Sequence, residues 1–357
     1  MARRLGPGRA VHFHLRHLCR PRRTRRVHQG PHRRGQGGRC PPPADQLRRH
    51  RRRRPRRRRL PGRQTAGRRA AVRHRHRGLP GRGGPHRRRL AFRIPPPGHR
   101  PRRLRPRRGG RPMTDLAAER WGESGPPIVM VHGSLSSAAA AFGEQKALAD
   151  RFRIVAPYRR GYQPSPPTSR IDPDRDAADV AELLCDGAHL LGTSMGGVVA
   201  MRAAALAPDK VWSLTVVEPP ALPNGSGRPA ADRLAAALRD YWADAGDSDP
   251  ATFVAGFLRV LNVDLPLPSP LSPPLREAAR NLRTERPWET GVPAEALART
   301  SFPKLVVTGG GTPGFEDVAD ALAETLSAKR VLFPGSPHAV QRIGQRFNDE
   351  FLAHLGG

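Results

Sequence analysis

From Met113 onward, short apolar runs alternate with longer stretches of helical character, and this alternation limits the possible folds more than any other feature. The expected strands are Pro127–Val131, Phe152–Pro157, His189–Leu191, Val211–Val217, Lys304–Thr308 and Arg330–Phe333. The expected helices are Ala138–Asp150, Pro173–Leu184, Met195–Ala207, Phe315–Ser327 and Gln345–Leu355. Short strands separated by helices favour a mostly parallel sheet that is covered by helices on both faces. The sequence therefore predicts an α/β fold.

Residues 221–300 interrupt this alternation. The segment is rich in Pro and has three helical patches, at about 230–243, 250–262 and 274–285, but no convincing strand. We expect these residues to form a helical lid inserted between two strands, and we call the segment the lid.

The run Gly192–Gly197 reads Gly-Thr-Ser-Met-Gly-Gly and lies between a predicted strand and a predicted helix. This is the G-x-S-x-G pattern of a sharp strand-to-helix turn, in which small neighbours let Ser194 project as a nucleophile. The backbone amide of Met195 would then face the oxyanion that develops during attack on a carbonyl carbon. A second amide is needed from an earlier strand end, and Ser134, which follows His132-Gly133 and precedes Leu135, is our candidate.

Four segments of residues 113–357 resemble the α/β-hydrolase superfamily. They are Val-His-Gly at 131–133, Arg-Arg-Gly-Tyr at 159–162, Gly-Thr-Ser-Met-Gly-Gly at 192–197 and Pro-Gly-Ser-Pro-His at 334–338. The resemblance implies an acyl-transfer site of the serine hydrolase or esterase type, with the chain order nucleophile, acid, histidine. It implies that Ser194 is the nucleophile and that His338, between the last strand and the closing helix, is the general base.

The acid departs from the usual pattern of this superfamily. The superfamily usually places it after the strand that corresponds to Lys304–Thr308, where this chain has three glycines, and the next carboxylates, Glu316 and Asp317, belong to the following helix. A variation within the superfamily places the acid one strand earlier, where Glu218 ends Val211–Val217. Two roles stay open for Glu218, the acid that orients His338 or a residue that anchors the lid.

Several other polar residues have simpler interpretations. We expect His132 to stabilise a turn, His189 to begin a core strand and His354 to be exposed in the terminal helix. Arg159 and Arg160 are interpreted as solvated loop residues, with binding of a substrate carboxylate as the alternative.

These features together predict a cofactor-independent serine hydrolase that acts on a small apolar ester or related acyl substrate through an acyl-enzyme. The lid should supply apolar pocket residues, and the candidates are Leu135, Trp242, Phe253 and Phe257. The sequence has no phosphate-binding loop, no dinucleotide-binding fingerprint and no cluster with metal-ligand spacing, so we expect neither a cofactor nor a metal. Three Cys and no apolar run of membrane-spanning length lead us to expect a cytoplasmic protein without a membrane span.

The formal charge of +34 is concentrated in the first third of the chain. Residues 1–112 contain 40 Arg and one acidic residue, Asp45, which leaves 24 basic and 29 acidic residues for the remainder. The first segment also lacks hydrophobic periodicity, so we expect it to be disordered. It is interpreted as a polycationic arm, as a targeting peptide or, as our preferred hypothesis, as sequence upstream of a true translation start at Met113.

The sequence is also consistent with two alternative functions. The missing acid after Thr308 would suit a non-catalytic relative of the α/β hydrolases that binds a ligand or a partner. The Arg-rich segment would suit a nucleic-acid-associated protein, although residues 113–357 are not expected to bind nucleic acid.

Overall fold

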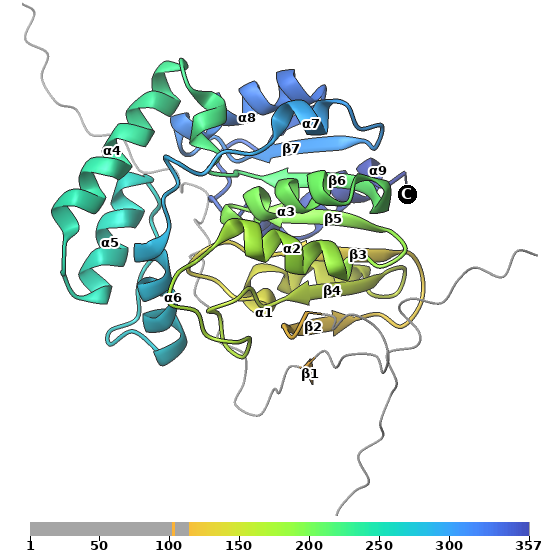
Figure 1. Cartoon of the computed structure of the whole chain (residues 1–357), viewed down its shortest axis with the longest axis horizontal. Coiled ribbons are helices and arrows are strands. Elements are labelled where there is room, and N and C mark those ends of the chain that lie inside the picture. Colours follow the sequence, from red (N-terminus) through yellow and green to blue (C-terminus); the bar gives the residue numbers. More distant parts are fainter. Residues whose placement is uncertain (1–101, 104–113, 357) are drawn as a thin grey trace, which may run out of the picture. The chain divides into compact units, whose positions relative to one another are not determined.

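The described part of the protein is organised around one eight-stranded sheet (Figure 1). The computed structural model describes residues 102–103 and 114–356. The strands are β1 (Arg102–Arg103), β2 (Ala117–Trp121), β3 (Pro127–Val131), β4 (Arg153–Pro157), β5 (Ala188–Thr193), β6 (Val211–Val217), β7 (Lys304–Thr308) and β8 (Lys329–Leu332). They lie in the order β1-β2-β4-β3-β5-β6-β7-β8, with β2 antiparallel to both neighbours and every pair from β4 to β8 parallel.

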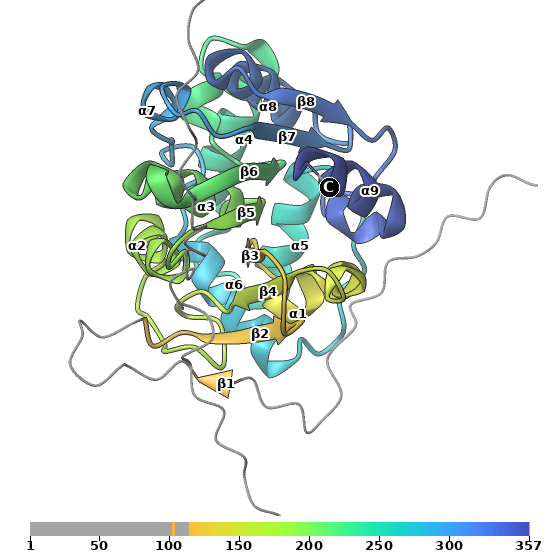
Figure 2. The same cartoon turned by 90° about the vertical axis from the view of Figure 1, so that its right-hand side faces the viewer.

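Helices cover both faces of the sheet, as the sequence predicts (Figure 2). One face carries α2 (Pro173–Leu183), α3 (Met195–Leu206) and α8 (Pro313–Leu326), and the other carries α1 (Ala138–Ala141), the 3-10 helix η2 (Gly143–Leu148) and α9 (Gln345–His354). Asp172 begins α2 by accepting hydrogen bonds from the backbone amides of Asp174 and Arg175. Such an N-cap satisfies donors that a helix cannot pair internally.

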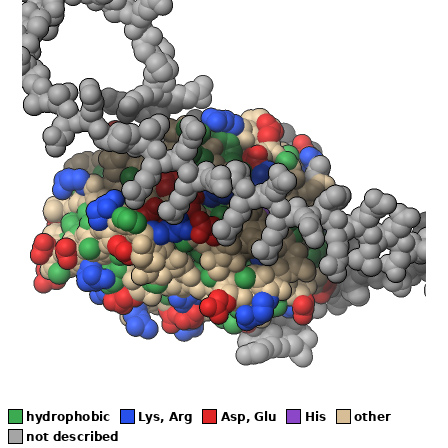
Figure 3. Space-filling model, turned by 90° about the horizontal axis from the view of Figure 1, so that it is seen from above, with side chains coloured by type: hydrophobic (Ala, Val, Ile, Leu, Met, Phe, Trp, Pro, Cys, Tyr) green, Lys and Arg blue, Asp and Glu red, His purple; other side chains and the backbone are tan. Residues whose placement is uncertain are grey.

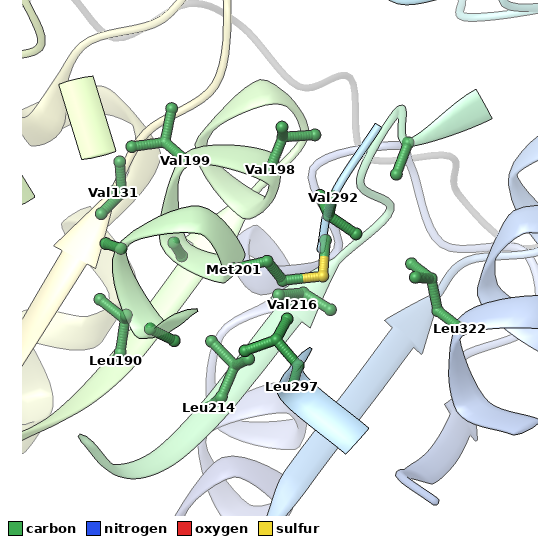
Figure 4. Close-up of a cluster of buried hydrophobic side chains, with 14 of the residues drawn as sticks. Val131, Leu190, Val198, Val199, Met201, Leu214, Val216, Val292, Leu297 and Leu322 are labelled. Atoms are coloured by element: carbon green, nitrogen blue, oxygen red, sulfur yellow. The ribbon is translucent and has the colours of Figure 1, made fainter. Parts of the chain in front are cut away.

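The core follows from the alternation of side chains along each strand. In β3, Val129 and Val131 pack in the cluster on the α3 side, whereas Ile128 and Met130 pack against α1 and α9. Figure 4 shows the cluster on the α3 side, where Met201 lies beside Val216 of β6. Each such buried side chain stabilises the fold by roughly 1.5–3 kcal/mol. The central strand β3 is apolar on both faces because both faces are covered.

The structure differs from the prediction at the first sheet edge. The Ala-Ala-Glu-Arg-Trp run of β2 has no strand-like pattern, yet it pairs with β4, and its Glu119 accepts a hydrogen bond of 2.6 Å from the Tyr158 hydroxyl. Arg102–Arg103 pairs with β2 as a two-residue strand. The predicted disorder of the residues around it lies outside the described part of the chain. Backbone pairing with an edge needs no side-chain periodicity. The other predictions for residues 1–112, including the start at Met113 and the polycationic arm, lie outside the described residues.

A second difference lies in the segment 138–150, which the sequence predicts as one helix. The α-helix ends after four residues at Ala141, and a 3-10 helix takes over at Gly143. Phe142 between them has a non-helical backbone, with φ −121° and ψ 23°. Gly is a poor helix former, which accounts for the break at this point.

The lid is helical, and no strand occurs between 221 and 300. It contains η4 (Leu222–Gly225), α4 (Pro229–Ala245), α5 (Pro250–Val260), α6 (Pro273–Thr284) and the unpredicted α7 (Ala294–Ala298). Helices α4, α5 and α6 lie together beyond one end of the strands in Figure 1. Phe253, Leu258 and Leu282 of the lid form a core cluster together with Leu135, Tyr162 and Ile171 from outside the lid. Leu222 and Leu297, near the ends of the lid, join the core of the sheet.

No helix among the described residues is long and apolar enough to cross a membrane. Charged side chains of both signs are interspersed over the described surface that Figure 3 shows. This distribution agrees with the nearly balanced charge of residues 113–357.

Two histidines lie close together on the side of the sheet away from the lid. His189 is buried, and its Nδ1 lies 2.9 Å from the Ser213 hydroxyl. His354 is partly buried in α9, so the expectation of an exposed side chain is wrong. Burial lowers the pKa of His189 to about 4, and the nearby His354 is a second cause of this shift. Burial also lowers the pKa of His354.

These lowered values predict a loss of stability in acid. The unfolded chain binds a proton at His189 near pH 6.5, whereas the native protein does so only near pH 4. The free energy of unfolding should therefore fall as the pH drops from about 6.5 towards 4, and His189 alone should account for about 2 kcal/mol of this loss. We expect urea unfolding of His189→Asn to change less between pH 7 and pH 4.5 than that of the unaltered protein. An equal pH dependence in both proteins would contradict this assignment.

Candidate active site

Ser194 lies in a tight turn between the end of β5 and the start of α3. Its φ of 51° and ψ of −129° are rare for a residue with a side chain. The turn is held by the Ser194 amide, which donates to the Val217 carbonyl at 2.8 Å, and by the Gly197 amide, which donates to the Ser194 carbonyl at 2.7 Å. A Cβ on Gly196 would lie 2.2 Å from the Val131 carbonyl oxygen, so this position requires glycine.

His338 lies in the loop between β8 and the 3-10 helix η5 (Val340–Ile343). Its Nε2 is 3.1 Å from Ser194 Oγ, although the two residues are 144 positions apart in the chain. The ring stacks on Phe315 at 5.0 Å, and 19% of the side chain is exposed. The imidazole can therefore accept the Ser194 proton and is also accessible to water.

Glu218 completes a chain of hydrogen bonds with these two residues. Its Oε2 lies 2.5 Å from His338 Nδ1, and its Oε1 accepts a hydrogen bond of 2.7 Å from the Gly309 amide. The carboxylate is buried, and the residue has a φ of 43°. Both of these partners lie outside the lid. This geometry allows Glu218 to orient His338.

The loop that usually carries the acid has no space for a side chain at its first position. A Cβ on Gly309 would lie 2.5 Å from the carbonyl oxygen of Ser336, in the loop of His338. Glu316 accepts a hydrogen bond from Thr308 Oγ1 at 2.7 Å, and Asp317 accepts from the first amides of α4. Glu316 and Asp317, the carboxylates that follow this loop in the sequence, therefore have hydrogen-bond partners other than His338.

The predicted oxyanion loop, residues 132–135, follows β3 and lies against Ser194. A Cβ on Gly133 would be 2.8 Å from Ser194 Cβ. His132 is buried; its Nδ1–H donates to the Gly133 carbonyl at 2.8 Å, and its Nε2 accepts from the Arg159 amide at 3.1 Å. Burial lowers the pKa of His132 to about 3, so the ring is neutral and stabilises the turn. Ser134 directly follows Gly133 in this loop, and Met195 is the first residue of α3, directly after Ser194.

Arg159 is not a solvated loop residue. Its side chain is 1% exposed, and it lies 3.1 Å from an oxygen of Asp176 and 3.5 Å from an oxygen of Glu285. Arg160 is 14% exposed and pairs with Asp179 at 2.6 Å. The sequence gives no signal for these pairs because their members lie far apart along the chain. Glu285 in particular is a functional candidate that the sequence analysis missed.

The predicted pocket residues fall into two groups. Phe253 and Leu135 are buried in the core of the lid, whereas Trp242 and Phe257 are half-buried and meet edge to face at 5.6 Å. A separate pocket of about 260 Å³ is lined by Met195 together with polar lid residues such as Glu285 and Thr284. This pocket is more polar than the apolar site that the sequence analysis expects. The lining role of the four candidates stays a prediction.

Comparisons with known proteins agree with this architecture. The chain is 35% identical to a pimeloyl-[acyl-carrier protein] methyl ester esterase of Aeromonas hydrophila over 104 residues, which are 29% of this chain and 41% of that relative. It is 36% identical over 107 residues to the dihydrolipoyllysine-residue acetyltransferase component of the acetoin cleaving system of Pseudomonas putida, covering 28% of this chain and 29% of the relative. The chain therefore spans less than half of the length of these curated relatives.

Solved structures share the fold over a longer stretch. A hydrolase from Pseudomonas aeruginosa has a TM-score of 0.50 and 25% identity, covering 68% of this chain and 94% of its own. Carboxylesterase CesB from Bacillus subtilis has a TM-score of 0.53 and 20% identity, covering 73% and 93%. The family model described as "Alpha/beta hydrolase family" matches residues 128–350. The sheet, the turn at Ser194 and this match together show that the chain belongs to the alpha/beta hydrolase family.

Proposed function

We propose that the protein is a cofactor-independent serine hydrolase that cleaves a small apolar ester or a related acyl substrate. The observation that carries the proposal is the hydrogen-bonded chain from Ser194 Oγ through His338 to Glu218. A nucleophile, a base within hydrogen-bond reach and a buried group that orients the base form the arrangement that activates a serine.

The first half of the proposed reaction forms an acyl-enzyme. Ser194 Oγ attacks the carbonyl carbon of the ester while its proton moves to His338 Nε2. The backbone amides of Met195 and Ser134 stabilise the resulting oxyanion. When the tetrahedral intermediate collapses, His338 returns the proton to the leaving alcohol. Glu218 accepts the hydrogen bond from His338 Nδ1–H throughout and stabilises the imidazolium.

The second half regenerates the enzyme. His338 removes a proton from a water molecule, and the hydroxide attacks the acyl carbon bound to Ser194. His338 then protonates Ser194 Oγ as the acid product leaves. The partial exposure of the His338 side chain, 19%, supports this step because water can reach the ring.

The relatives support an ester substrate. The Aeromonas relative is named as an esterase, and the match covers 41% of its length. The half-buried apolar side chains of the lid, Trp242 and Phe257, support a small apolar acyl group.

A panel of p-nitrophenyl esters tests this function. We expect hydrolysis of the acetate and butyrate esters well above the spontaneous rate, with kcat/KM falling for the decanoate, because the aromatic side chains of the lid pack closely around Trp242. Rates equal to spontaneous hydrolysis for every ester would sink the proposal and favour a protein that only binds its ligand.

A further inference from the structure

The oxyanion loop adopts a conformation that it cannot hold by itself. Leu135, directly after Ser134, has a φ of 53°, a left-handed backbone that disfavours a leucine. Such conformations persist only where the surroundings determine them. Leu135 is 7% exposed and belongs to the core cluster of the lid. Part of what holds this loop therefore comes from the lid.

The second constraint on the loop is a hydrogen bond to a buried carboxylate. Ser134 Oγ donates to Glu285 Oε2 at 2.6 Å. Glu285 follows the last residue of α6 and is 4% exposed, and its other oxygen lies 3.5 Å from the Arg159 guanidinium. A buried carboxyl group of the lid thus accepts a hydrogen bond from the side chain of the residue whose amide is the proposed oxyanion donor.

The end of α6 is itself docked against the body of the protein. Asn281 Nδ2 donates to the Gly161 carbonyl at 2.6 Å, and Thr284 Oγ1 accepts from the Ile171 amide at 2.9 Å. Arg159, the ionic partner of Glu285, also donates its backbone amide to His132 at 3.1 Å. The loop between His132 and Leu135 is therefore held from the body at one end and from the lid at the other.

We propose that Glu285 is a positioning residue that fixes Ser134 for catalysis, so that the oxyanion hole is complete only when α6 of the lid is docked. The inference rests on the proposed function, because it assigns the Ser134 amide to the oxyanion. Glu285 acts through Ser134 and does not itself touch the reacting atoms.

A competing role for Glu285 is direct contact with substrate, since it also lines the pocket that Met195 borders. The two roles differ in what they change. Loss of a positioning residue lowers kcat and weakens transition-state analogues, whereas loss of a binding contact raises KM.

The test compares variants of Ser134 and Glu285 with a p-nitrophenyl ester and with a trifluoromethyl ketone inhibitor. Loss of one oxyanion donor costs about 10²–10³ in kcat in serine proteases, so loss of its positioning by Ser134→Ala should lower kcat about 10- to 100-fold. KM should change by less than about threefold, and inhibitor affinity should fall by the same factor as kcat/KM. Ser134→Thr and Glu285→Gln, which keep the donor and the acceptor, should recover most of the activity.

The double variant Ser134→Ala/Glu285→Leu should be no slower than the more affected single variant, because both changes break the same hydrogen bond. Glu295→Gln, at an exposed carboxylate in α7, serves as the control and should match the unaltered protein. Glu285→Leu leaves a buried Arg159 with one partner fewer, so its fold is checked by thermal unfolding. Ser134→Ala keeps the pair of Glu285 and Arg159 and carries the test if Glu285→Leu does not fold.

Unchanged kcat and inhibitor affinity in Ser134→Ala would overturn the inference. A rise in KM at constant kcat in Glu285→Leu would also overturn the inference, and it would assign Glu285 to substrate binding. Failure of the proposed function itself is recognised separately, because in that case the unaltered protein would hydrolyse no ester above the spontaneous rate, or Ser194→Ala would retain full turnover whatever the state of Glu285.

Discussion

Replacing Ser194 with alanine is expected to reduce p-nitrophenyl ester turnover by at least about 10³-fold, because the covalent route is then closed. The change removes one hydroxyl, and the turn is held by backbone hydrogen bonds that alanine retains. The protein should therefore fold normally and still bind substrate. Steady-state kinetics with p-nitrophenyl acetate, together with a thermal unfolding curve, measure both expectations.

The matched control is Ser226→Ala, at an exposed serine of the lid, which should leave kcat/KM unchanged. Comparable loss in both variants would point to damage of the lid or the fold. Retention of turnover in Ser194→Ala would mean that another residue performs the chemistry.

The second large effect is expected at Glu218. Glu218→Gln keeps the shape of the side chain but replaces a carboxylate with an amide that can hold His338 in the wrong tautomer. The corresponding change in the Ser-His-Asp template costs about 10⁴ in kcat, and we expect a loss of about 10²- to 10⁴-fold in kcat here. The thermal stability of Glu218→Gln should stay close to that of the unaltered protein. The measurement of activity is kcat for a p-nitrophenyl ester at neutral pH.

Glu316→Gln is the informative control for this variant. Glu316 follows β7, the strand after which the acid of this superfamily usually lies, but its carboxylate contacts Thr308 and Gly310 and not His338. We expect its activity to remain near that of the unaltered protein. Loss of activity in Glu316→Gln with near-normal activity in Glu218→Gln would place the acid after β7 and would refute the assignment of Glu218.

The sequence predicts the parts of this protein that depend on local patterns. The central strands β3 and β7 are largely apolar on both faces, and the Gly-x-Ser-x-Gly run at 192–196 is a local sequence pattern. Close backbone approaches require its glycines, Gly192 against Gly196 and Gly196 against Val131. The sequence also singles out Glu218 as a candidate acid, because the three glycines after Thr308 carry no carboxylate, but it leaves the role of a lid anchor open.

The features that the sequence does not reveal depend on contacts between distant residues. β2 is a strand because β4 offers it an unpaired edge, whereas its own Ala and Glu residues favour a helix. The link between Ser134 and Glu285 joins residues 151 positions apart. No spacing rule connects a serine in one loop to a glutamate at the end of a lid helix. The two side chains meet only because α6 is docked on the body of the protein.

The most direct measurement of the central claim is covalent labelling by a fluorophosphonate, which reacts with activated serines. Intact-mass spectrometry should show one adduct per chain, and peptide mapping should place it on Ser194. Ser194→Ala should remain unlabelled, and His338→Ala should be labelled far more slowly. An unlabelled native protein, or an adduct on a different serine, would contradict the account of Ser194 as an activated nucleophile.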